Sequence, residues 1–172
     1  MSDYSRSDYF ARARVAAVAM LVVAAGVAIT GSFLDWVKIT ARPSIDPEAD
    51  FGGARVEPLE IRAPYSGIDA ADGWYVVVAS VVLVAAAGGL AVTKRSRYAW
   101  LAFVAAMFVG AVGFAAYRSV GDLDSSISRR MEIVGDPDPS IGITLVAIGG
   151  VAALLGAVLG LISTPPRRAE QL

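Results

Sequence analysis

Four runs of twenty or more residues contain no Asp, Glu, Lys or Arg, and every charged residue of this 172-residue chain lies outside them. The runs cover residues 15–34, 73–93, 98–117 and 139–166, and the apolar part of the last spans residues 141–162. A helix rises about 1.5 Å per residue, so about twenty residues cross a hydrocarbon core of about 30 Å. The runs therefore predict four membrane-spanning helices.

Composition supports a membrane protein rather than a soluble bundle. Helices of a soluble bundle need a polar face, which these runs lack, and the chain is 56% hydrophobic. A chain of this length cannot bury four wholly apolar helices in one soluble core. The sequence predicts an all-α membrane protein, a four-transmembrane-helix bundle with a small, partly β extracytoplasmic loop. We expect one domain over residues 1–172, with helices at about 13–35, 72–93, 97–120 and 139–163 and external loops at 36–71 and 121–138.

The charges that flank the helices predict the orientation in the membrane. Residues 1–14, 94–97 and 167–172 together carry eight Lys or Arg and three acids, whereas residues 35–72 and 118–138 carry seven and thirteen. Lys and Arg in short loops favour the cytoplasmic side. We therefore expect a multi-pass protein of a bacterial inner membrane with both termini in the cytoplasm. The first run is longer than the core of a cleaved signal peptide, which is about 7–15 residues, so it is interpreted as a retained helix.

Sequence signals at the helix ends and in the loops make further predictions. Aromatic side chains at the run ends are expected to anchor the protein at the membrane interface, because their rings are apolar and their N–H or O–H groups stay wet. Alternation at residues 36–40 and 55–62 predicts a two-stranded hairpin. The second external loop is expected to begin as an extension of the third helix to about Ile127 and then to turn at residues 135–139, where Asp138 and Pro139 start the fourth helix. The predicted anchors are Trp36, Trp74, Tyr75 and Trp100.

Few residues suggest chemistry. The chain has no Cys and no His, which excludes thiolate and imidazole metal sites, Cys nucleophiles and His-based proton transfer. Acid pairs such as Asp136 and Asp138 lack the further oxygens of a calcium loop and are interpreted as solvated charge. Ion-coupled transporters usually place ionisable groups at membrane depth, and the four runs have none. We expect no enzyme activity, no catalytic residues, no cofactor, no metal and no nucleic-acid partner.

Small residues recur on two of the helices at four-residue spacing. In lipid no hydrophobic force drives helices together, so small residues allow the close backbone approach that holds them. This pattern fits either packing within the bundle, which we favour, or the docking of a partner helix. The residues are Ala102, Ala106 and Gly110 in the third run and the GxxxG pair Gly156 and Gly160 in the fourth.

Two segments carry a family resemblance, namely FLDWV at residues 33–37 and PYSGIDAADGW at residues 64–74. With them the chain resembles small actinobacterial four-helix membrane proteins of unknown function, and its layout is similar to that of the tryptophan-associated transmembrane proteins. The resemblance implies the inner membrane of a high-GC Gram-positive bacterium and a role beside large envelope machines such as Mce-type lipid importers. It assigns no catalytic residue.

Two functional interpretations follow. The first is a non-enzymatic accessory or scaffold subunit of a larger inner-membrane complex, in envelope lipid transport if the resemblance holds. Its expected partners are other integral membrane proteins, lipid, and periplasmic protein domains that contact the loop at 36–71. The alternative is a self-contained small transporter, channel or lipid-binding membrane protein.

Overall fold

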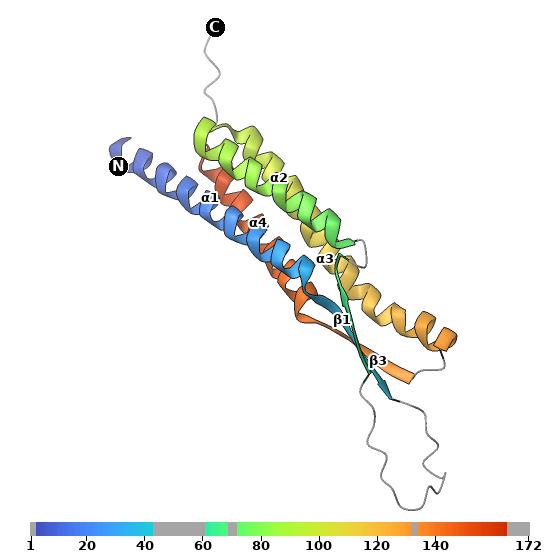
Figure 1. Cartoon of the computed structure of the whole chain (residues 1–172). Coiled ribbons are helices and arrows are strands. Elements are labelled where there is room, and N and C mark those ends of the chain that lie inside the picture. Colours follow the sequence, from blue (N-terminus) through green and yellow to red (C-terminus); the bar gives the residue numbers. More distant parts are fainter. Residues whose placement is uncertain (1–2, 43–60, 69–71, 132–133, 165–172) are drawn as a thin grey trace, which may run out of the picture.

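The computed structural model describes residues 3–42, 61–68, 72–131 and 134–164. Each of the four helices contains a stretch that is long and apolar enough to cross a membrane, as predicted, so the chain is a multi-pass membrane protein. The elements in chain order are α1 (Asp3–Phe33), β1 (Asp35–Arg42), β2 (Ile61–Ser66), α2 (Asp72–Thr93), α3 (Ser96–Met131), β3 (Val134–Pro139) and α4 (Ile141–Ile162) (Figure 1).

The helices form a four-membered ring in which α1 contacts α2 and α4, and α3 contacts α2 and α4. One end of the ring, here called the turn end, carries the start of α1, the short α2–α3 connection and the end of α4 (Figure 1). The strands lie at the opposite end, here called the sheet end. Helix α3 continues past its membrane-spanning part, Ser96–Arg118, for about 20 Å and contacts β3. The third helix is therefore longer than the predicted 97–120, and the predicted extension to about Ile127 is present and reaches Met131.

The three strands form one antiparallel sheet in the order β2-β1-β3. The first predicted strand lies within β1, whereas most of the second, 55–62, lies outside the described residues. The turn predicted at residues 135–139 is wrong, because β3 is extended there and pairs with β1. A residue before proline is pushed towards extended backbone, and both Asp136 and Asp138 precede one. Helix α4 accordingly begins at Ile141, after Ser140, rather than at Asp138 and Pro139.

Prolines occupy the outer edges of both edge strands. The backbone N–H of Ser140 donates to the carbonyl of Trp36 at 2.9 Å, and this bond fixes which backbone groups of β3 face β1. By the alternation of an antiparallel ladder, Pro137 and Pro139 then have their ring nitrogens on the outer edge of β3, and Pro64 lies likewise on β2. Proline lacks an N–H, so neither edge offers a full row of donors to a further strand.

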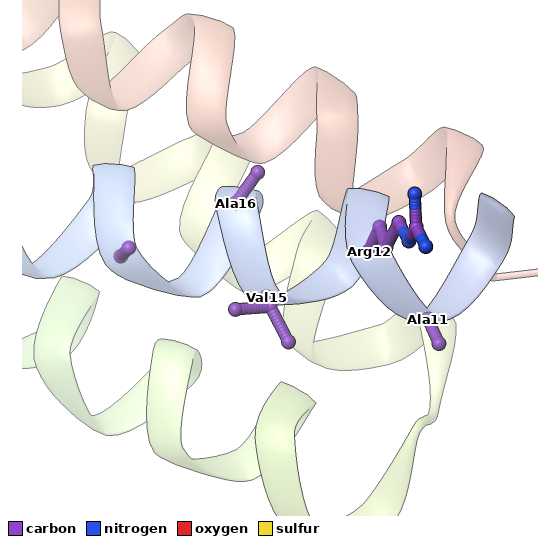
Figure 2. A pocket seen from close by; sticks show the side chains of 5 residues that line it. Ala11, Arg12, Val15 and Ala16 are labelled. Atoms are coloured by element: carbon purple, nitrogen blue, oxygen red, sulfur yellow. The ribbon is translucent and has the colours of Figure 1, made fainter. Parts of the chain in front are cut away.

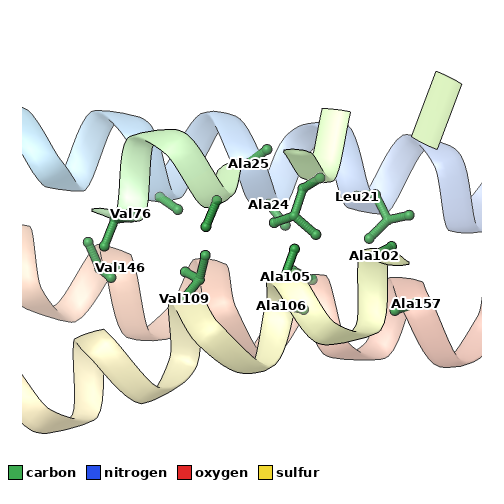
Figure 3. Close-up of a cluster of buried hydrophobic side chains, with 14 of the residues drawn as sticks. Leu21, Ala24, Ala25, Val76, Ala102, Ala105, Ala106, Val109, Val146 and Ala157 are labelled. Carbon is green, nitrogen blue, oxygen red and sulfur yellow. The ribbon is translucent and has the colours of Figure 1, made fainter. Parts of the chain in front are cut away.

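The interior of the bundle consists mainly of small side chains. Fourteen of the twenty-two buried apolar residues in the described part of the chain are alanine. Large side chains such as Trp100, Met107 and Phe108 lie outside, with about half of their surface exposed. Ala102 and Ala106 are fully buried in the central cluster (Figure 3). Small residues inside allow the helix backbones to approach each other closely, which is how helices associate in lipid.

Helix α4 contacts α1 through glycines at seven-residue intervals. Gly142 lies against Gly31, Gly149 against Ala24 and Ala28, and Gly156 against Leu21. A Cβ added to Gly149 would lie 3.0 Å from the carbonyl oxygen of Ala24, so the two backbones are nearly in contact. Seven residues are close to two helical turns, and the three glycines therefore line one side of α4.

Helix α4 meets α3 through a second close contact. A Cβ added to Gly150 would lie 2.8 Å from the Cα of Gly110, and one added to Gly113 would lie 3.1 Å from Cγ1 of Val146. The first of these contacts joins backbone to backbone, so no side chain can move aside to make room. Helix α4 is thus held on two sides by contacts that depend on glycine.

The Gly150 contact predicts a large effect of bulk at that position. We expect Gly150→Leu to lower the free energy of unfolding by about 3 kcal/mol, because the new side chain meets the α3 backbone. The control is Gly88→Leu on α2, since nothing lies within 4 Å of a Cβ built at Gly88. Thermal unfolding of both variants in mild detergent, followed by circular dichroism, measures the difference. Equal stability of the two variants would contradict the packing described here.

Candidate functional site at the junction of bundle and sheet

Trp36 lies where the bundle meets the sheet, as the second residue of β1 and shortly after the end of α1. Its side chain is only 3% exposed, and its indole Nε1–H donates to the carbonyl of Gly31 at 2.9 Å. Gly31 belongs to the last turn of α1, whose carbonyls have no partner within the helix. The indole therefore caps the C-terminus of α1 while its own backbone belongs to β1.

Two glycines from distant parts of the chain enclose the Trp36 indole. The ring lies directly against Gly67, just after β2, where a Cβ would collide with it. On the α4 side, a Cβ added to Gly142 would lie 2.7 Å from Cδ1 of Trp36 and 2.7 Å from the carbonyl oxygen of Asp35. Glycine is required at both positions because the indole and the chain before it fill the space that a side chain would need.

Backbone hydrogen bonds tie the same elements together. Besides the bond from Ser140 to Trp36, the N–H of Gly73 at the start of α2 donates to the carbonyl of Gly67 at 2.8 Å. We call Gly31, Trp36, Gly67, Gly73 and Gly142 the junction. It joins the end of α1, the start of β1, the turn after β2 and the starts of α2 and α4. The junction therefore places the start of the sheet directly against these helix ends.

The four predicted anchors do not share one environment. Trp36 does not fit an interfacial anchor, because its indole is enclosed by protein and its N–H bonds to Gly31. Trp74, Tyr75 and Trp100 are 55%, 58% and 57% exposed near the starts of α2 and α3. An anchor needs a ring that reaches the lipid headgroups. The rings of these three residues are accessible to lipid headgroups, and their role as anchors stays a prediction.

The five predicted small residues all lie at contacts inside the bundle. Ala102 and Ala106 are fully buried, and Gly110 meets Gly150 of α4. The GxxxG pair also faces inward: a Cβ on Gly156 would lie 3.2 Å from Cγ of Leu21, and one on Gly160 would lie 3.0 Å from Cδ2 of Leu90. The faces of Ala102, Ala106, Gly156 and Gly160 are therefore already occupied by helices of this chain. Nothing lies within 4 Å of a Cβ built at Gly110, so for Gly110 the partner interface stays a prediction.

The contacts of the junction and the glycine interval on α4 were not predicted, although Trp36, Gly67 and Gly73 lie in the two segments that carry the family resemblance. The glycine interval on α4 is visible in the spacing of Gly142, Gly149 and Gly156. That spacing indicates a helix contact only when α1 is known to lie beside α4. Gly67 and Gly142 lie far from Trp36 in the sequence, so their contact with the indole is a tertiary property.

Most hydroxyl groups near the helix ends bond within their own helix. Thr30 donates to the carbonyl of Gly26 at 2.9 Å, Ser32 to that of Ala28 at 2.9 Å and Thr93 to that of Gly89 at 2.7 Å. Ser80, in the middle of α2, is fully buried and its hydroxyl has no hydrogen-bond partner. The described residues contain no group of three or more His, Cys, Asp or Glu side chains placed to hold a metal.

At the turn end, an arginine of α1 caps α4. The guanidinium of Arg14 donates to the carbonyl of Ser163 at 3.3 Å, just past the last turn of α4. A cation is favoured there because the carbonyl end of a helix carries partial negative charge. The ends of the α1–α4 pair are therefore both closed by side-chain donors, by Trp36 at the sheet end and by Arg14 at the turn end.

Comparison with known proteins gives no relative. No protein-family model, no curated protein and no solved structure matches this chain. The resemblance to small actinobacterial membrane proteins thus stays a prediction.

Trp36 gives a spectroscopic test of the junction. The chain has three tryptophans, so the double variant Trp74→Phe with Trp100→Phe leaves Trp36 as the sole emitter. We expect weak quenching of its fluorescence by acrylamide. Adding Gly67→Ala should displace the indole, raise the quenching and lower the free energy of unfolding by about 1–3 kcal/mol. The matched control is Gly26→Ala, where nothing lies within 4 Å of the new Cβ. Strong quenching before Gly67 is changed would contradict the enclosed indole.

The Arg14 cap predicts a smaller effect at the turn end. Arg14→Gln should lower the free energy of unfolding by about 1 kcal/mol, because the guanidinium no longer neutralises the end of α4. The control is Arg95→Gln in the exposed α2–α3 connection, where we expect less than about 0.5 kcal/mol. Chemical unfolding in detergent compares the two variants, and an equal loss in both would show that the Ser163 contact contributes nothing specific.

Proposed function

We propose that this chain is a non-enzymatic accessory or scaffold subunit of a larger inner-membrane complex. Both termini would lie in the cytoplasm and the sheet on the extracytoplasmic side. The observation that carries the proposal is the junction, where Trp36 is enclosed by Gly67 and Gly142. A sheet fixed in this way to membrane helices can hold a partner domain at a set position relative to the bilayer.

The packed interior favours this role over a self-contained transporter or channel. Transporters usually place ionisable groups in the bundle, where they couple transport to an ion. In the described part of this bundle the buried residues at membrane depth are apolar or serine, and α4 meets α1 and α3 through glycine contacts without a gap. Such contacts support a static frame around which other subunits assemble.

A partner helix would dock on the outer face of α1. The glycine and alanine faces inside the bundle are occupied, whereas Ala16, Ala19, Gly26 and Thr30 on α1 are exposed. Nothing lies within 4 Å of a Cβ built at Gly26, so another helix can approach the backbone closely there. The outer face of α3, with Trp100, Met107 and Phe108, carries larger side chains and suits lipid contact instead.

The extracytoplasmic contact would be made by the loop at 36–71, which includes β1 and β2. Prolines at the outer edges of β2 and β3 disfavour the addition of a partner strand. A periplasmic partner domain would therefore bind a face of the sheet or the segment between β1 and β2. The resemblance to the actinobacterial proteins extends the proposal to envelope lipid transport of the Mce type.

Purification from native membranes tests the proposal. The tagged full-length chain, extracted in gentle detergent from cells that encode it, should carry integral membrane proteins that mass spectrometry identifies. We expect Gly26→Leu to abolish that association without loss of stability, because the new side chain occupies the docking face. Replacing residues 43–60 by a short Gly/Ser linker should release an extracytoplasmic partner while the helices still insert.

The control for the docking face is Ala111→Leu, on the exposed side of α3, which does not adjoin α1 in the helix ring. It should leave every partner bound. Recovery of the chain alone, as a monomer or small oligomer, would contradict the accessory role and favour the transporter alternative. Equal loss of partners in both leucine variants would remove the outer face of α1 from the proposal.

A further inference from the structure

A shallow depression lies on the outer surface of α1 near the turn end. It has a volume of about 410 Å³ and is lined by Ala11, Arg12, Val15, Ala16 and Ala19, all of them exposed. Ala11 and Val15 point to one side of α1, and Arg12 and Ala16 point to the other (Figure 2). The depression is thus a shallow, open trough along the helix.

The depth of the trough in the membrane follows from the sequence of α1. The charge-free run begins at Val15, so Arg12 lies at the level of the lipid headgroups and Ala16 and Ala19 lie in the hydrocarbon region. The distance along the helix from Arg12 to Ala19 is about 10 Å. One end of the trough therefore carries a cation, and the remainder is apolar and lined by small side chains.

This combination matches the chemistry of one kind of ligand. A guanidinium binds phosphate through several parallel N–H donors, and the apolar trough accepts a hydrocarbon chain. Arg14, two residues on, is held at the carbonyl of Ser163, whereas Arg12 is exposed at the mouth of the trough. Exposed Lys94, Arg95 and Arg97 lie at the same end of the bundle but do not line the trough.

We propose that this trough binds an anionic phospholipid of the surrounding bilayer, with the phosphate on Arg12 and one acyl chain along Val15, Ala16 and Ala19. The site lies on the same helix as the docking face around Gly26, but nearer the turn end. It does not depend on the accessory role, because a lipid can occupy it whether or not a partner is present.

Native mass spectrometry of the purified full-length protein tests the site. The protein is titrated with phosphatidylglycerol and, separately, with phosphatidylcholine, and bound lipids are counted. We expect the protein to bind phosphatidylglycerol with about fivefold higher affinity than phosphatidylcholine. Arg12→Gln should abolish this difference in affinity. Ala19→Leu should weaken the binding of both lipids, because the new side chain fills the apolar part of the trough. Circular dichroism of each variant verifies the fold.

Two control variants distinguish lipid binding at this site from nonspecific binding of lipid elsewhere on the protein. Arg95→Gln removes an exposed cation at the same end and should leave the preference unchanged, and Ala111→Leu adds the same bulk on α3 and should leave both affinities unchanged. An unchanged preference in Arg12→Gln, an equal loss in Arg95→Gln, or unchanged binding in Ala19→Leu would each overturn the proposal. So would full displacement of the lipid by soluble glycerol phosphate, since that would show a phosphate site without a chain.

Discussion

Close approach of α4 to α1 and α3 is the constraint on which the rest of the structure depends. In lipid no hydrophobic effect drives apolar helices together, so close contact between their backbones must supply the attraction. Gly142, Gly149 and Gly156 provide it on one side of α4 and Gly150 on another. The Trp36 indole also lies against Gly142. The same glycine therefore contacts α1 and the first residues of the sheet. Gly142 thus takes part both in the packing of the helices and in the placement of the sheet.

This coupling gives the molecule a fixed relation between its membrane part and its extramembrane part. Many membrane proteins connect the two through a linker, whereas here α1 passes into β1 and β3 passes into α4 with a single residue between them. The two passages are side by side, because Ser140 bonds to Trp36. A partner that binds the sheet would thus be held in register with the helices, which is why the junction favours a scaffold role.

The helices could be predicted from the sequence, and the site could not. Charge-free runs predict spanning helices because an exposed charge in hydrocarbon is costly, and that constraint needs no knowledge of neighbours. The sequence predicts Trp36 at the membrane interface because aromatic residues at helix ends usually lie there. Its burial depends on Gly67 and Gly142, which only the tertiary fold brings near. Strand β3 was mistaken for a turn because alternating Asp and Pro are common in turns, although proline equally favours extended backbone.

The position of α4 in the chain has a consequence for biosynthesis. The first three helices are synthesised before α4, which packs between α1 and α3. Until then α1 can contact α2 but lacks α4, with which it makes its most extensive contact. Until β3 arrives, β1 has only β2 to pair with, and a two-stranded hairpin is marginally stable in water. Strand β3 immediately precedes α4. The sheet and the membrane bundle therefore reach completion one directly after the other, and a chain truncated before β3 would lack both.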